Sequence, residues 1–267
     1  MQLFNVPNIL TGFNFLCGVA SVILSLSGRL DICIYPIFAA LVFDYLDGFS
    51  ARLLHQKSPM GKELDSLADL VSFGLAPGIW MFMILPSVLV KETVTSNINL
   101  IVYYFLQWFM AVIDGRSFNY LPFIALLIPF LSLFRLAKFN IDTRQSMSFI
   151  GLPTPANTLF FMIFPILLFV SRDGAIAFSL RNFFFHPVIL IGCCVIFSIL
   201  LVAEIPLFSL KFSSYKFQDN IVRYTFLIVA VLVLIFLRFL GIPIIIVLYL
   251  VFSIIENKFV KKSTYEV

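Results

Sequence analysis

Residues 44–69 read DYLDGFSARLLHQKSPMGKELDSLAD and stand between two long apolar stretches. The segment carries four aspartates: Asp44, Asp47, Asp65 and Asp69. Steps of three or four residues place the first two on one face of a helix and the last two on one face of the next helix. Because a short turn around Ser58 and Pro59 joins these helices as an antiparallel pair, we expect the four carboxylates to converge.

The composition places this helix pair in a membrane. Of the 267 residues, 61% are hydrophobic and 12% are charged, whereas a soluble domain has about 45–50% and about 25%. These values exclude a soluble enzyme, a disordered regulator and a disulfide-stapled secreted domain. The net charge of +4 suits contact with anionic lipid headgroups, and we expect no nucleic-acid partner.

Apolar stretches recur along the whole chain. Nine are candidates for membrane crossings: 9–28, 32–52, 67–90, 98–113, 119–138, 155–171, 187–205, 220–237 and 239–255. The fourth holds Gln107, two tyrosines and a tryptophan, a composition typical of a helix that lies at the membrane interface. We therefore predict an all-α polytopic membrane helix bundle with about eight transmembrane helices, forming a single domain over residues 1–267.

The positive charges orient this bundle. With eight crossings and both termini in the cytoplasm, 12 of the 18 lysines and arginines lie on the cytoplasmic side. The other six lie outside: Arg29, Lys91, Arg116, Arg172, Arg181 and Arg238. A ninth crossing would reverse the orientation of every later segment and place more of the lysines and arginines outside. The positive-inside rule therefore favours eight crossings. The acidic segment then faces the cytoplasm, at the inner (plasma) membrane of a prokaryote-like cell.

Carboxylates inside a membrane bundle indicate a functional site unless a partner neutralises them. Oxygen ligands without cysteine or suitably spaced histidine select hard divalent ions, which are magnesium, manganese or calcium. Small residues at Gly48, Ala51 and Gly61 leave space on the same helix faces for a ligand group. Small residues at these positions could instead serve only to pack membrane helices together. The four acids on the same helix faces favour a ligand cleft.

The same residues resemble the signature of the CDP-alcohol phosphatidyltransferase family. That signature runs Asp, two residues, Asp-Gly, two residues, Ala-Arg, eight residues, Gly, three residues, Asp, three residues, Asp. Every fixed position is met here: Asp44, Asp47, Gly48, Ala51, Arg52, Gly61, Asp65 and Asp69. Near the N-terminus, the stretch PNILT at 7–11 resembles the entry segment of the wider family.

The resemblance implies transfer of a phosphatidyl group from CDP-diacylglycerol to an alcohol, with release of CMP. Asp44, Asp47 and Asp65 would be metal ligands for a pair of Mg²⁺ or Mn²⁺ ions, with Ca²⁺ as another occupying ion. Asp69 would be the general base and could also touch a metal. The nucleotide would be held by a further set of residues: Asn8, Thr11, Gly48, Ala51, Arg52 and Gly61.

Three more stretches resemble the bacterial phosphatidylserine synthases within this family: SLADLVSFGLAP (66–77), FRLAKFN (134–140) and GLPTPAN (151–157). They imply L-serine as the acceptor alcohol. A serine carboxylate needs hydrogen-bond donors, which Arg135, Lys138 and Asn140 would supply. Inositol phosphate and glycerol 3-phosphate also need basic residues, so these acceptors stay open on the residues alone.

A different class of function, ion-coupled transport, also uses intramembrane acids. Transporter acids typically lie near the membrane midplane at the interface of inverted repeats, and no such repeat is visible here. We therefore expect an enzyme with a catalytic core at about 7–205 and two additional helices at about 220–256. The resemblance further implies a homodimer in contact with membrane lipids.

Overall fold

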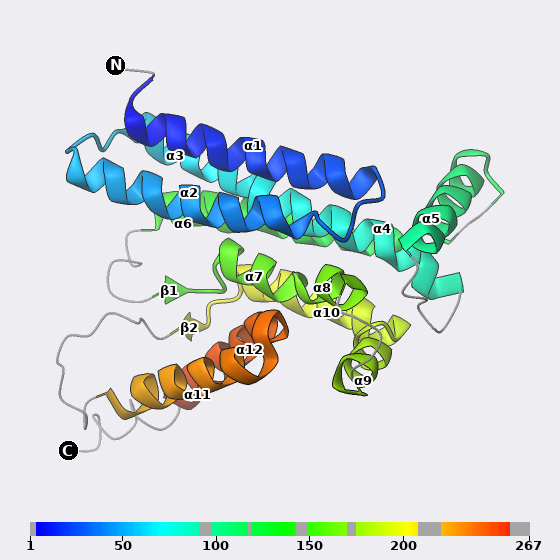
Figure 1. Cartoon of the computed structure of the whole chain (residues 1–267). Coiled ribbons are helices and arrows are strands. Elements are labelled where there is room, and N and C mark those ends of the chain that lie inside the picture. Colours follow the sequence, from blue (N-terminus) through cyan, green and yellow to red (C-terminus); the bar gives the residue numbers. More distant parts are fainter. Residues whose placement is uncertain are drawn as a thin grey trace.

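The structure, a computed structural model, describes residues 4–90, 98–116, 119–142, 149–169, 175–207 and 220–256 (Figure 1). Its main helices are α1 (Val6–Leu26), α2 (Ile34–Leu53), α3 (Pro59–Asp69), α4 (Ala76–Val90), α5 (Ile98–Ile113), α6 (Leu127–Ile141), α7 (Thr154–Phe161), α8 (Ile163–Phe169), α9 (Ala175–Phe184), α10 (Pro187–Val202), α11 (Ile221–Leu237) and α12 (Gly241–Ile255). Short helical turns are η1 (Leu70–Leu75), η2 (Leu121–Leu126) and η5 (Arg238–Leu240). The chain is therefore helical throughout most of its described length, as predicted.

Long apolar helices confirm a polytopic membrane bundle. Five segments are long and apolar enough to cross a membrane: Val6–Leu26, Ile34–Leu53, Pro59–Val90, Leu121–Ile141 and Ile221–Ile255. The last is a hairpin of α11 and α12, whose open end brings Arg223 Nη2 to 3.7 Å from Glu256 Oε1. Three shorter apolar segments accompany these five: Asn99–Ile113, Thr154–Leu168 and Pro187–Val202. With the hairpin counted as two helices, the predicted eight crossings follow if Asn99–Ile113 lies at the interface.

Helix α5 differs from the other apolar helices in its direction. It lies at the end of the bundle where α4 stops, and its axis departs from the common direction of α1, α2 and α4 (Figure 1). Its Trp108 donates a hydrogen bond to the carbonyl of Asn119, and the Trp108 ring packs against Phe82 of α4 and Phe123 of η2. This is the arrangement expected of a helix that lies at the interface and lets the chain return through α6.

Helix α4 forms the centre of the bundle. In the segment Pro59–Val90, 78% of the most apolar window is buried, against 22–28% in the other four long segments. Trp80 is fully buried and donates a hydrogen bond to the hydroxyl of Ser21 on α1. The outer helices therefore leave apolar side chains for lipid, which is typical of a bundle whose solvent is the bilayer.

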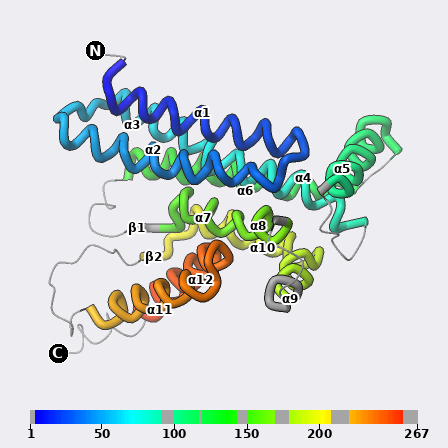
Figure 2. The backbone as a smooth tube through the Cα atoms, in the orientation of Figure 1, coloured from blue at the N-terminus to red at the C-terminus, as the bar shows by residue number. Residues whose placement is uncertain are grey.

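The turn between α1 and α2 lies at the end of the bundle opposite the acidic segment (Figure 2). Gly28 there has a φ of +80°, which an L side chain rarely adopts. Arg29 Nε lies 3.0 Å from Asp31 Oδ1, and this hydrogen bond lowers the pKa of the Asp31 carboxyl. Arg116 lies three residues after α5 and Arg238 directly after α11, whereas Lys91 and Arg172 lie outside the described residues.

A π-helical turn, η1, interrupts the long segment directly after Asp69. The Thr158 hydroxyl of α7 donates a hydrogen bond of 2.7 Å to the Phe73 carbonyl in this turn. On the other side, α1 approaches η1 at backbone distance, because a Cβ on Gly18 would lie 2.5 Å from Ser72 Oγ and 2.7 Å from Ser72 Cα. The sequence alone did not predict this turn, which is a feature often found at functional sites.

Replacing Gly18 by alanine tests this close contact. The new methyl group meets the backbone of Ser72, so one helix must shift, and we expect a loss of about 1–3 kcal/mol of stability. Thermal unfolding in detergent, followed by tryptophan fluorescence, measures the loss. Gly12→Ala on the same helix is the matched control, since nothing lies within 4 Å of its Cβ. Equal midpoints for the two variants would contradict the contact.

Candidate active site

Three helices meet at the end of the bundle that holds the acidic segment. Helix α1 contacts both α2 and α3 there (Figures 1 and 2). Just after α2, His55 takes a left-handed conformation with a φ of 54°, which reverses the chain. The Ser58 hydroxyl then caps α3 by accepting a hydrogen bond of 3.0 Å from the Gly61 amide. The local sequence therefore fixes the antiparallel pair that was predicted.

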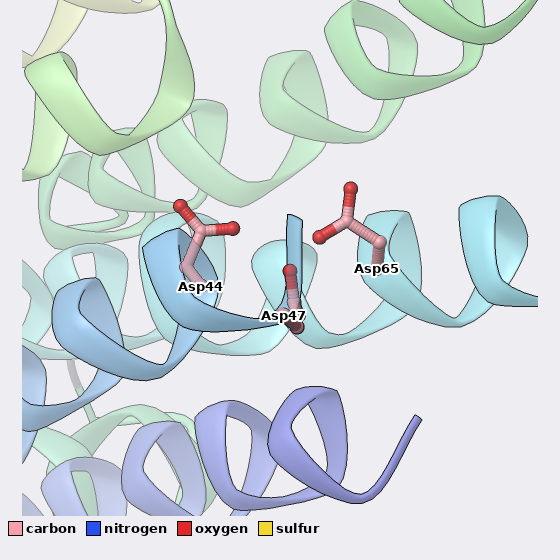
Figure 3. A group of neighbouring side chains, drawn as sticks. All are labelled: Asp44, Asp47 and Asp65. Carbon is pink, nitrogen blue, oxygen red and sulfur yellow. The ribbon is translucent and has the colours of Figure 1, made fainter. Parts of the chain in front are cut away.

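Three of the four aspartates form a compact group. Asp44, Asp47 and Asp65 each offer a carboxylate oxygen, and these oxygens all lie within 4.8 Å of one another. Figure 3 shows the side chains of Asp44 and Asp65 pointing into the same space, with Asp47 beside them. Asp65 Oδ1 is buried and has no hydrogen-bond partner in the described chain. A group of oxygen ligands with an unpaired buried oxygen fits a hard metal ion.

Hydrogen bonds from α1 reach two of the aspartates. Thr11 donates from its hydroxyl to Asp47 Oδ2 at 2.6 Å, and Asn14 donates from its amide to Asp69 Oδ1 at 3.0 Å. Both interactions are buried. Donors of this kind favour the ionised form of a carboxylate, so α1 offsets part of the repulsion among the acids.

The fourth aspartate, Asp69, lies beside the group of three and is not part of it. It is buried, and its carboxyl contacts that of Asp44. The predicted convergence of four carboxylates is thus seen as a group of three with Asp69 adjoining it through Asp44. This position distinguishes Asp69 from the other acids.

The larger cavity at the site has a volume of about 720 Å³. All six residues predicted to hold a nucleotide line it: Asn8, Thr11, Gly48, Ala51, Arg52 and Gly61. Asp47 and Asp65 also line it. A Cβ on Gly61 would lie 3.2 Å from Asn8 Oδ1 and from Ser58 Oγ, so a larger residue there would crowd the wall of the cavity.

A smaller cavity of about 280 Å³ adjoins the first, because Asp65 and Phe139 line both. Asp44, Asp69 and Arg135 line only the second, together with Ser66 and residues 153–155. The Arg135 side chain is buried; its Nε donates to the Leu152 carbonyl at 3.3 Å, and its guanidinium lies 5.3 Å from the centre of the Phe139 ring. These contacts place the Arg135 side chain in the wall of the second cavity.

The wall formed by residues 153–155 is held by the end of α10. A two-residue antiparallel pair joins β1 (Phe149–Ile150) to β2 (Pro206–Leu207), and these strands were not predicted. The amides of Gly151 and Leu152 donate to the carbonyls of Ile205 and Leu200, both at 2.9 Å. A Cβ on Gly151 would lie 2.8 Å from the Leu201 carbonyl, which explains why glycine stands at this position.

Lys138 and Asn140 line neither cavity. Lys138 Nζ lies 2.8 Å from Glu204 Oε1, in an ion pair that solvent reaches. The amide of Asn140 donates to Ser66 Oγ at 2.9 Å and to Glu63 Oε2 at 3.3 Å, which ties α6 to α3. Of the three residues predicted to bind the acceptor, the structure brings only Arg135 to the second cavity.

The sequence reasoning missed two polar residues of the site, Asn14 and Thr154. Asn14 stands three residues beyond Thr11, which itself stands three beyond Asn8, so the helical period could have found it. Thr154 lines the second cavity from the first turn of α7, within the stretch GLPTPAN. The position of Thr154 at the cavity depends on how α7 packs against the other helices, which the spacing of residues in the sequence does not show.

Comparison with known proteins agrees with this geometry. A family model described as CDP-alcohol phosphatidyltransferase matches residues 4–203. The chain belongs to the CDP-alcohol phosphatidyltransferase family. Every residue of the two cavities lies inside the match. The hairpin of α11 and α12 lies after the matched residues.

Individual members of the CDP-alcohol phosphatidyltransferase family are similar over most of the chain. The CDP-diacylglycerol–serine O-phosphatidyltransferase of Helicobacter pylori J99 is 28% identical over 258 residues, which cover 95% of this chain and 91% of that protein. The enzyme of the same name from Bacillus subtilis is 30% identical over 178 residues, covering 63% and 82%. The archaetidylserine synthase of Methanothermobacter thermautotrophicus is 29% identical over 172 residues, covering 64% and 61%.

Removing one carboxylate from the group of three tests whether it holds a metal. We expect Asp65→Asn to weaken Mn²⁺ binding to the detergent-purified protein at least about tenfold, because a neutral amide replaces a charged ligand. Isothermal titration calorimetry measures this. Asp31→Asn, which alters an acid at the opposite end of the bundle, should bind Mn²⁺ as the unchanged protein does. Equal affinities for all three proteins would exclude the metal group.

Proposed function

We propose that this chain transfers the phosphatidyl group of CDP-diacylglycerol to the hydroxyl of L-serine, giving phosphatidylserine and CMP. The observation that carries the proposal is the pair of adjoining cavities. One is lined by six of the eight residues of the family signature, and the other by Asp44, Asp69 and Arg135. The similarity to serine phosphatidyltransferases, which in one case covers 95% of this chain, supports serine as the acceptor.

The residues of the second cavity can activate and orient the serine. The guanidinium of Arg135 would pair with the serine carboxylate, an interaction for which its planar donors are well suited. Asp69 would accept the proton of the serine hydroxyl as the oxygen attacks phosphorus. A phosphorus–oxygen bond forms to serine, the bond from phosphorus to the CMP oxygen breaks, and CMP leaves through the larger cavity.

The residues of the first cavity would hold the nucleotide part of the donor. Gly48 and Ala51 leave the wall of α2 open beside Arg52, and Asn8 and Thr11 line the opposite wall on α1. Asp44, Asp47 and Asp65 would hold two Mg²⁺ or Mn²⁺ ions, and Asp69 would also bind one. Such ions, when bound, neutralise the negative charge of the diphosphate.

We place this site at the cytoplasmic face of the inner (plasma) membrane. Arg52, Lys57 and Lys62 surround the turn between α2 and α3, and the positive-inside rule assigns such a cluster to the cytoplasm. Since α1 starts and α12 ends at this end of the bundle (Figure 1), both termini would be cytoplasmic. The chain would be a single domain, and we expect a homodimer, which light scattering after size exclusion would measure.

The release of CMP tests the reaction and its acceptor together. Purified protein would receive CDP-diacylglycerol and Mn²⁺ or Mg²⁺, with serine, inositol phosphate, glycerol 3-phosphate or no acceptor in parallel. We expect release that depends on serine and that Asp44→Asn abolishes. Release with another alcohol would support the same reaction but would show that serine is not the acceptor. Absence of release with every acceptor and metal would overturn the proposal.

Arg135→Lys tests the serine pocket. Lysine keeps the charge but loses the paired donors, so we expect the KM for serine to rise about tenfold to a hundredfold while the KM for CDP-diacylglycerol stays within twofold. Lys138→Gln is the matched control, because its exposed ion pair with Glu204 contributes little. If both variants raise the serine KM equally, the second cavity is not the serine pocket.

A further inference from the structure

Helix α1 presents three polar side chains to the site at regular steps of three residues: Asn8, Thr11 and Asn14. The first two line the larger cavity. Asn14 lies one turn deeper, where its side chain is fully buried and contacts Asp69. Asn14 therefore connects α1 to Asp69, one of the three acids that line the second cavity.

The hydrogen bond between Asn14 and Asp69 has only one workable direction. The amide nitrogen Nδ2 donates to Asp69 Oδ1 at 3.0 Å, whereas the amide oxygen Oδ1 of Asn14 is buried without a partner in the part of the chain that the structure describes. Turning the amide round would set its oxygen against the carboxylate. For packing alone, an apolar side chain of similar size would serve better here, because an unpaired buried oxygen is unfavourable. The advantage of an amide over an apolar side chain at this position is therefore its hydrogen bond to Asp69.

The backbone of Asn14 is fixed against the turn that follows Asp69. Its carbonyl accepts a hydrogen bond of 2.8 Å from Ser72 Oγ, and Gly18, one turn further along α1, packs directly on Ser72. Helix α1 cannot slide along η1 without breaking these contacts. The amide of Asn14 is therefore held at a set position relative to the carboxylate it contacts.

From this geometry, and resting on the proposed function, we propose that Asn14 is a positioning residue for the catalytic base. By occupying Oδ1 of Asp69, it fixes the rotation of the carboxylate and leaves Oδ2 to accept the proton of the acceptor hydroxyl. The serine oxygen forms its bond to phosphorus as this proton moves to Oδ2 and the bond to CMP breaks. Asn14 itself touches neither substrate.

The test compares Asn14→Leu with the unchanged protein in the CMP-release assay with serine and Mn²⁺. Leucine has a similar volume but no donor, so the carboxylate of Asp69 is free to rotate. We expect kcat to fall about tenfold to a hundredfold, since small misplacements of a reacting group have effects of this size. The KM values for serine and CDP-diacylglycerol should stay within about twofold. Asn14→Ala serves for the same measurement if the leucine variant does not fold.

Ser72→Ala is the matched control. It removes the contact between η1 and the Asn14 carbonyl but leaves the donor to Asp69 in place, so it measures the effect of loosening this helix contact. We expect its kcat to fall by less than about threefold, even if its unfolding midpoint falls as much as that of Asn14→Leu. An unchanged kcat in Asn14→Leu, or an equal loss of kcat in both variants, overturns the positioning role. If the unchanged protein shows no serine-dependent release, the proposed function fails, and this inference fails with it.

Discussion

Mutual repulsion among four aspartates in an apolar bundle is the constraint on which the rest of this site depends. Like charges a few ångströms apart in a medium of low dielectric constant repel strongly unless donors or cations lie among them. The structure supplies the donors from α1, through Thr11 to Asp47 and Asn14 to Asp69. It leaves Asp65 Oδ1 buried without a hydrogen-bond partner among the described residues, which is where the proposed cation would bind. A cation bound beside this oxygen would offset the remaining repulsion.

Close packing of small residues serves the same constraint. Donors on α1 reach the acids only if α1 lies near both α2 and the turn after α3. Gly18 permits this approach, since its missing side chain lets the backbone of Ser72 come within contact distance. The π-helical turn then gains a hydrogen bond to its Phe73 carbonyl from Thr158 of α7. Small residues that pack membrane helices and small residues that open a ligand cleft thus act together in one structure.

All the residues predicted to hold the nucleotide line the first cavity, whereas only one of the three residues predicted to bind the acceptor lines the second. Gly48, Ala51 and Gly61 lie close in sequence on α2 and α3, so helical spacing predicted them beside the acids. The family resemblance implied Asn8, Thr11 and Arg52. The second cavity combines α3 with α6 and the start of α7, which meet through tertiary packing. Arg135 and Lys138 are three residues apart on α6, yet Arg135 faces the cavity and Lys138 pairs with Glu204, 66 residues further along the chain. Local spacing could not separate these roles, nor could it predict η1 or the strand pair.

The spacing of the aspartates explains how two cavities share one acidic cluster. Because α2 and α3 are antiparallel, the acids nearest the turn, Asp47 and Asp65, lie opposite each other, and both line the larger cavity. Asp44 is three residues further into α2 and Asp69 four residues further into α3, about 4.5 Å and 6 Å along their axes. These two contact each other and line the smaller cavity. A spacing of two or five residues would turn the deeper carboxylates to another face of their helices. The steps of three and four therefore separate the proposed site for the nucleotide from the proposed site for the attacking alcohol.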